Sequence, residues 1–184
     1  MSAASPVTGT TARRLEVLLG REQVSGRLPT VAAGVVRDGD LVWSGSVSGT
    51  GGETGPDVQY RIGSITKTLV AVAVLQLRDE GLLDLGDPLS RHLPGVPYGE
   101  RTLRELLAHS SGMHSEPPGS WWERSPGVSF DQLVSTLEET DRERGPAFAP
   151  GATFHYTNTA YALLGEVVAR VRGESWWDLS LIHI

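Results

Sequence analysis

The sequence predicts an α+β fold, in which an antiparallel hairpin near the N-terminus is followed by a mostly helical region. Two β-prone runs, 31–36 and 41–47, flank Asp38-Gly39, a dipeptide favoured in two-residue hairpin turns. Strands joined by so tight a turn are antiparallel. Most later segments instead carry apolar residues at the three- to four-residue spacing of amphipathic helices. These two patterns together predict the α+β class.

Size and composition narrow the class of protein. With 184 residues the chain can form one domain with a hydrophobic core, and its 39% hydrophobic and 21% charged residues are ordinary for globular proteins. A formal charge of -6 argues against a nucleic-acid or anionic membrane partner. The chain has no cysteine, which excludes thiol nucleophiles and thiolate metal sites. Because it shows neither a signal-peptide pattern nor an apolar run of ~18 to 20 residues, we expect a cytoplasmic protein.

The N-terminal part is expected to contain two longer helices, one before the hairpin and one after it in the sequence. The first covers about 11–25, after a flexible tail of residues 1–10, and Gly26 can end it. The second starts at Ser64 and should end at Gly81. Its middle is apolar on every side, which predicts a helix that is buried on every side.

Further helices are predicted in the second half of the chain. Thr102 and Ser129 each open a capping-box pattern, in which Glu or Gln stands three residues after Ser or Thr. These two helices are expected to end near Ala108 and Glu139 respectively. A last amphipathic helix is expected over about 159–172, because its apolar residues recur at helical spacing.

Ser64 and Lys67 form the first candidate site. Lys67 is the only lysine among sixteen basic residues, and lysine, unlike arginine, can lose its proton when it is buried or near positive charge. Residues three apart lie on one face of a helix, so the Ser64 hydroxyl and the Lys67 amine can touch. That pairing suits a serine nucleophile with a lysine base. The alternative, an ordinary solvated helix face, fits poorly with the apolar run that follows.

Tyr156-Thr157-Asn158 is the second candidate site. A tyrosine hydroxyl beside a lysine ammonium has a lowered pKa and can relay protons, and an asparagine amide can hold a substrate carbonyl. A buried tyrosine followed by a helix-capping asparagine would explain the tripeptide equally well. The segment lies in a loop ahead of a predicted helix, where functional residues are common.

Other candidate sites have weaker support. The histidines lack a metal-ligand spacing such as H-E-x-x-H, and no G-x-S-x-G elbow occurs. Asp84 and Asp87 fit a turn and a cap better than a pair of catalytic acids. Trp121 and Trp122 are expected to pack in a loop, with the edge of a substrate cleft as the alternative role.

Three motifs stand in the order seen in one known family. They are YRIGSITK at 60–67, LRELLAHSSGM at 103–113, and the segment 150–165, which opens with Pro-Gly and contains Tyr-Thr-Asn. On these motifs the chain resembles the serine β-lactamase-related hydrolases, a group of class C β-lactamases, D-alanyl-D-alanine carboxypeptidases and esterases. The resemblance covers roughly residues 15 to 178. It implies the N-terminal portion of the β-lactamase/transpeptidase-like fold, in which helices flank an antiparallel sheet.

The resemblance also implies a mechanism. It makes Ser64 the acylated nucleophile, Lys67 its hydrogen-bonded base, Tyr156 the proton relay and Asn158 a substrate contact. Which of Lys67 and Tyr156 takes the first proton stays open, because strongly coupled groups titrate as a unit. The expected protein is a hydrolase that forms an acyl-enzyme on an ester, amide or β-lactam bond of a small molecule. Such chemistry needs no cofactor and no metal, and the net charge described above argues against a nucleic-acid or membrane partner.

The C-terminal part departs from this family. Its members end with a strand that carries Lys-Thr-Gly or His-x-Gly, and this chain has no such segment after the third motif. We therefore expect a C-terminally truncated domain over 11–178 and a non-native end at 179–184. The alternative to a hydrolase is an inactive fragment, or a non-catalytic member of the same fold that recognises penicillin or binds a partner.

Overall fold

The computed structural model describes residues 6–55, 58–116, 127–176 and 178. Two compact units make up the chain, Met1–Arg61 and Ile62–Ile184, and each is described by itself. The predictions for Trp121 and Trp122 fall outside the described residues. So do much of the predicted tail and all of the predicted non-native end, so these stay predictions.

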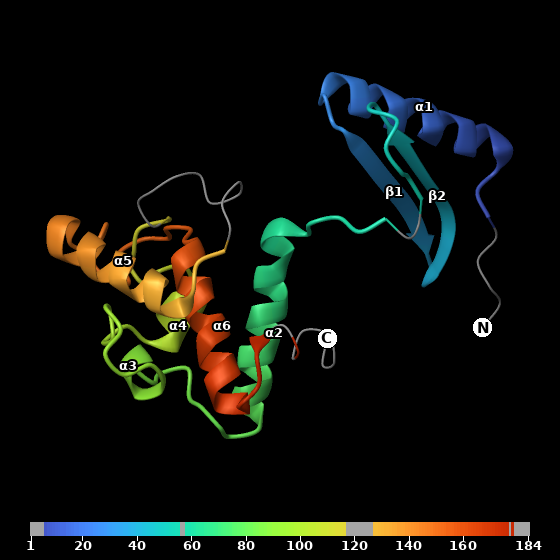
Figure 1. Cartoon of the computed structure of the whole chain (residues 1–184). Coiled ribbons are helices and arrows are strands. Elements are labelled where there is room, and N and C mark those ends of the chain that lie inside the picture. Colours follow the sequence, from blue (N-terminus) through green and yellow to red (C-terminus); the bar gives the residue numbers. More distant parts are fainter. Residues whose placement is uncertain (1–5, 56–57, 117–126, 177, 179–184) are drawn as a thin grey trace. The chain divides into compact units, whose positions relative to one another are not determined.

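The first unit contains helix α1 (Gly9–Ser25) and a hairpin of strands β1 (Thr30–Arg37) and β2 (Asp40–Ser48). The strands pair antiparallel, as predicted, with a bulge between Val35 and Val36. Asp38 and Gly39 have φ angles of 53° and 91°, the left-handed pair that a type I′ turn requires. Helix α1 packs along the hairpin (Figure 1).

The second unit is helical within its described residues. Its elements are the 3₁₀ turn η1 (Gly63–Ile65) and the helices α2 (Thr66–Asp79), α3 (Leu89–His92), α4 (Leu103–Leu107), α5 (Phe130–Arg144) and α6 (Asn158–Arg172). Helices α2 and α6 lie side by side, and α4 packs against α6 (Figure 1). The core of the unit is formed where these helices meet, and it contains the fully buried leucines Leu77, Leu106, Leu163 and Leu164.

Helix α2 corrects the prediction of burial on every side. Its buried residues are Val70, Ala73, Val74 and Leu77, which follow the i, i+3, i+4, i+7 spacing of a single stripe. Val72, on the helix between them, is 40% exposed. Within the second unit α6 packs against one side of α2, so an apolar sequence around the whole helix is buried along only one face.

Both predicted capping boxes are present, at Thr102 and at Ser129. Helix α4 ends where the sequence predicted, but α5 continues to Arg144 instead of ending near Glu139. The continuation keeps Thr140 buried, and its hydroxyl donates a 2.7 Å hydrogen bond to the carbonyl of Thr136. The helix stops at Gly145, whose φ of 64° cannot continue a right-handed helix.

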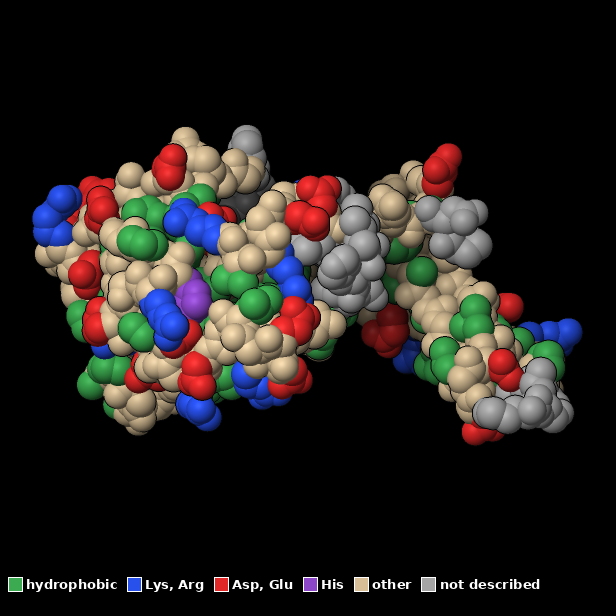
Figure 2. All heavy atoms as spheres, turned by 90° about the horizontal axis from the view of Figure 1, so that it is seen from below, with side chains coloured by type: hydrophobic (Ala, Val, Ile, Leu, Met, Phe, Trp, Pro, Cys, Tyr) green, Lys and Arg blue, Asp and Glu red, His purple; other side chains and the backbone are tan. Residues whose placement is uncertain are grey.

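The surface of the second unit carries both signs of charge. In the face drawn in Figure 2, acidic and basic side chains are interspersed among hydrophobic ones. None of the helices in the described part of the chain has the length and apolar character needed to cross a membrane.

Candidate active site

Ser64 and Lys67 lie together at the start of α2, as the sequence predicted. Ser64 sits in the 3₁₀ turn η1, where the sequence predicted α-helix, and Lys67 lies in the first turn of α2. The turn continues directly into the helix, so residues three apart still lie on one face and the same contact can form. The Nζ atom of Lys67 donates to Ser64 Oγ across 3.4 Å. Ser64 is exposed and Lys67 is half-buried, so the hydroxyl is accessible while its partner is partly desolvated.

Tyr156 and Asn158 reach the same two residues from the start of α6. The Tyr156 hydroxyl donates a 2.7 Å hydrogen bond to Ser64 Oγ, although 92 positions separate the two residues. The amide oxygen of Asn158 accepts a hydrogen bond from Lys67 Nζ. All four residues predicted to form the site therefore lie in one hydrogen-bonded cluster.

Thr157 fixes the start of α6 between these two residues. It is extended and fully buried, and its hydroxyl oxygen accepts from the backbone N–H of Ala160, which caps the helix. The same hydroxyl donates to the carbonyl of His114 at 2.9 Å. Asn158 is the first residue of α6, one position before the predicted start of this helix, and its backbone N–H donates to the carbonyl of Ser115. The segment that carries Tyr156 and Asn158 is thus held on both sides.

His109 packs against Tyr156 and helps to position it. The sequence did not indicate this role. Its Nδ1 accepts a 3.1 Å hydrogen bond from the backbone N–H of Thr157, so this nitrogen carries no proton. The imidazole ring packs against Tyr156 and Tyr161, with centroids 4.6 Å and 4.9 Å apart. The hydroxyl of Tyr161 is anchored on the carbonyl of Leu107. A layer of rings therefore sets the position of the Tyr156 side chain.

The charge of Lys67 acts on these rings. Its Nζ lies 4.7 Å from the centroid of the Tyr156 ring. Burial alone would raise the pKa of Tyr156, but hydrogen bonds to Lys67 and Ser64 together with the Lys67 charge outweigh it, so this pKa lies below its ordinary value. Burial, and then the Lys67 charge, lower the pKa of His109.

Glu116 belongs to the cluster as well and was missed by the sequence analysis. Its carboxylate accepts a hydrogen bond from Nδ2 of Asn158. The contact joins positions 42 residues apart, from a loop and from a helix start, so no local spacing could indicate it. Its only signal in the sequence is its place, three residues after the HSSGM end of the second motif.

The remaining candidates have structural roles. Asp84 accepts from the backbone N–H of Gly86 in a turn, and the buried Asp87 accepts from the backbone N–H of Asp84. Asp87 also pairs with Arg91 and His92, so the two aspartates do not form an acid pair. In the described part of the chain, no group of three or more His, Cys, Asp or Glu residues is arranged to hold a metal ion.

The Ser64 hydroxyl is hydrogen-bonded to both a lysine and a tyrosine, where the starts of α2 and α6 come together. This is the arrangement implied by the resemblance described above. The profile of the family described as Beta-lactamase matches residues 11–180. The chain therefore belongs to the β-lactamase family, and its helices and antiparallel hairpin are part of the β-lactamase/penicillin-binding-protein fold.

Members of this family that resemble the chain include hydrolases of several kinds. The chain is 31% identical to esterase EstB of Burkholderia gladioli, an alignment that covers 89% of this chain and 46% of EstB. A D-stereospecific amidohydrolase from Streptomyces sp. has 33% identity and a TM-score of 0.74, over 97% of this chain and 54% of that protein. A class C β-lactamase from Rhodobacter sphaeroides has 26% identity and a TM-score of 0.71, over 92% and 47%. The chain thus spans less than half the length of EstB and about half that of the two solved structures.

Proposed function

We propose that the chain carries the nucleophile half of a serine hydrolase that forms an acyl-enzyme on an ester, amide or β-lactam bond. Ser64 is the nucleophile, Lys67 its base, Tyr156 the proton relay and Asn158 a contact for the substrate carbonyl. The substrate is a small molecule, and the names of the esterase, amidohydrolase and β-lactamase relatives support all three bond types.

One observation carries the proposal. Two groups that can exchange protons, the Lys67 amine and the Tyr156 hydroxyl, both lie within hydrogen-bonding distance of a single exposed serine hydroxyl. An unassisted serine hydroxyl is a weak nucleophile, and an adjacent base is what activates it. The lowered pKa of Tyr156, caused by hydrogen bonds and by the charge of Lys67 against an opposing effect of burial, supports its role as a relay.

In the proposed reaction, Ser64 Oγ attacks the carbonyl carbon, and its proton passes to Lys67 or Tyr156. The bond from the carbonyl carbon to the leaving oxygen or nitrogen breaks, and the leaving group takes up that proton. Water then attacks the acyl ester on Ser64 and gives one proton to the same pair. That proton returns to Ser64 Oγ as the acid is released, so the site ends as it began.

Mass spectrometry after treatment with a fluorophosphonate tests this assignment in the longest chain that the gene encodes. We expect a single adduct on Ser64, its loss in Ser64→Ala, and an unchanged adduct in the control Ser135→Ala, an exposed serine on α5. Hydrolysis of an ester, an anilide and a chromogenic β-lactam by the same preparations identifies the preferred bond. An unmodified Ser64, or an adduct on another residue, refutes the proposal.

A cytoplasmic location remains a prediction from the sequence. Fractionation of cells that express the native gene, with immunodetection of the chain in each fraction, tests it. Recovery of the protein outside the cytoplasmic fraction would contradict the prediction and leave the chemistry of Ser64 unaffected.

A further inference from the structure

The amide of Asn158 connects Lys67 to Glu116, and the chemistry of its partners fixes how it is oriented. A lysine ammonium can only donate a hydrogen bond and a carboxylate can only accept one. The amide oxygen of Asn158 therefore faces Lys67, and its Nδ2 group faces Glu116. Nδ2 carries two hydrogens, so one remains for a substrate carbonyl. Glu116 stands on the far side of the substrate contact from Lys67.

The Glu116 carboxylate adds a negative charge to the site. It is half-buried, and its hydrogen bond comes from a neutral amide. Within the described ranges of the chain, no lysine, arginine or histidine forms an ion pair with it. A partly desolvated carboxylate is stabilised by a cation, and Lys67 is held away from it by the intervening amide.

We propose that Glu116 selects substrates whose acyl part carries a free amine, protonated near neutral pH, close to the scissile carbonyl. This inference rests on the proposed function, because Asn158 is the contact that places the carbonyl beside Glu116. The substrate ammonium donates to the second carboxylate oxygen while the remaining Nδ2 hydrogen holds the carbonyl. A substrate with a carboxylate at that position is repelled. The substrate class is therefore amino-acyl esters or amides with an unblocked amine.

A positioning role for Glu116 is the competing explanation, and one substitution separates the two. In Glu116→Gln the side-chain oxygen can still accept from Asn158 Nδ2, so Asn158 keeps its orientation while the charge is lost. The variant therefore keeps the orientation of Asn158 but should lose the preference for substrates with a free amine.

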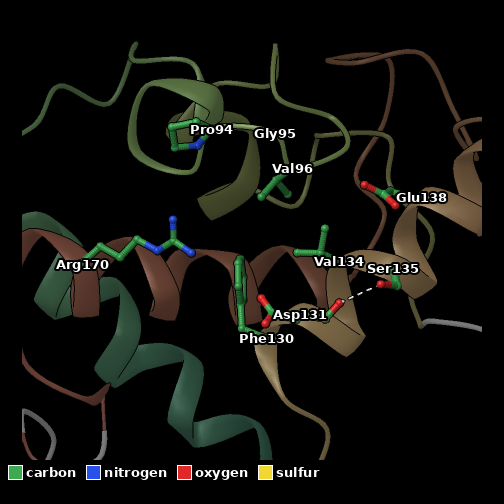
Figure 3. A pocket seen from close by; sticks show the side chains of 9 residues that line it. All are labelled: Pro94, Gly95, Val96, Phe130, Asp131, Val134, Ser135, Glu138 and Arg170. Atoms are coloured by element: carbon green, nitrogen blue, oxygen red, sulfur yellow. Dashed lines mark hydrogen bonds between the residues drawn. The ribbon is translucent and has the colours of Figure 1, made fainter.

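A matched control removes the same charge elsewhere. Glu138 lies on α5 and lines a groove of about 270 Å³ between α5, the C-terminal end of α6 and the 94–96 segment (Figure 3). Glu138 is exposed, and among the described residues no hydrogen bond or ion pair joins it to Ser64, Lys67, Tyr156 or Asn158. Glu138→Gln therefore changes net charge by the same amount outside the hydrogen-bonded cluster.

The experiment compares two covalent probes of nearly equal shape, diphenyl 2-aminoethylphosphonate and diphenyl propylphosphonate. Each forms a bond from Ser64 Oγ to phosphorus and releases one phenol, which takes up the serine proton. The second-order labelling rates are measured for the wild type, Glu116→Gln and Glu138→Gln in the longest chain that the gene encodes. We expect the wild type and Glu138→Gln to favour the amine probe by about tenfold or more, the contribution typical of a charge-assisted hydrogen bond.

In Glu116→Gln the two probes should react at similar rates, so that the preference for the amine probe, measured as the ratio of the two rates, is lost. Equal rates for both probes in the wild type, or a preference that persists in Glu116→Gln, overturn the inference while leaving the acyl-enzyme proposal intact. Failure of both probes to label Ser64 in every variant refutes the proposed function, and the inference falls with it.

Discussion

Replacing His109 by phenylalanine tests how the site is supported. The substitution keeps a ring against Tyr156 and Tyr161, whose centroids lie 4.6 Å and 4.9 Å from the imidazole. It removes the Nδ1 acceptor of the Thr157 backbone N–H, and Thr157 is fully buried. A buried donor without a partner costs about 1–3 kcal/mol, so we expect His109→Phe to lower the free energy of unfolding by about that amount near pH 7.5.

The loss of stability caused by His109→Phe should become smaller as the pH falls. Burial and the charge of Lys67 lower the pKa of folded His109 below its ordinary value of 6.5, so the unfolded chain binds this proton more readily than the folded chain. The stability that neutral His109 contributes is therefore present above about pH 6.5 and is lost as the pH falls through the lowered pKa. His109→Phe lacks this titration, and the difference between wild type and variant narrows on acidification.

Urea unfolding at pH 7.5 and pH 5.5, followed by circular dichroism, measures both effects. His155→Phe is the matched control, because its partner, the Ser115 hydroxyl, keeps a hydrogen bond to the Tyr156 carbonyl. We expect the control to cost less at pH 7.5. A His109→Phe variant as stable as the wild type at pH 7.5, or a gap that does not narrow at pH 5.5, would show that the Thr157–His109 bond does not carry this stability.

Two further substitutions test the proton relay and the turn beside it. Tyr156→Phe keeps the ring on His109 but removes the hydroxyl bonded to Ser64, so fluorophosphonate labelling of Ser64 should slow by about 10²- to 10⁴-fold; an unchanged rate contradicts the relay role. Gly112→Ala should destabilise the chain by more than Gly151→Ala in urea unfolding. Both glycines have φ near 75°, which costs about 1 kcal/mol in each, but only at Gly112 would the added Cβ collide with a backbone atom, the Phe148 carbonyl oxygen 2.1 Å away. Equal losses would show that the chain relaxes around the collision.

Much of the fold could be predicted because local chemistry decides it. The turn at Asp38-Gly39 needs left-handed backbone, and the capping boxes at Thr102 and Ser129 satisfy the first N–H groups of their helices from within four residues. The sequence predicts an end of α5 near Glu139, which is too early, because no residue near Glu139 indicates that Thr140 is buried. Whether a residue is covered depends on other elements, which a local pattern does not contain.

The same distinction between local and long-range contacts decides which parts of the site could be predicted. Ser64 and Lys67 are three residues apart, so their contact follows from helical geometry and was predicted from the residues themselves. The approach of Tyr156 to Ser64 depends on how α6 packs on α2, and it was predicted only through resemblance to a family. Glu116 contacts Asn158 across 42 residues and lies outside the three family motifs. Neither local spacing nor the resemblance to the family could therefore predict its contact. The selectivity proposed for Glu116 could come only from the structure.

The packing of α6 on α2 has a consequence for how this chain can diverge. The groups around Ser64 Oγ stand at the starts of these two helices, and both helices share one buried core. The long stretch between the helices can accept insertions at its exposed turns, provided that the 109–116 segment still meets the start of α6. Substrate preference can then change through the loops while the order of the reacting groups along the chain and their arrangement in space stay the same. Conversely, a conservative change in the helix interface, far from any substrate, can silence the site by a small rotation of one helix.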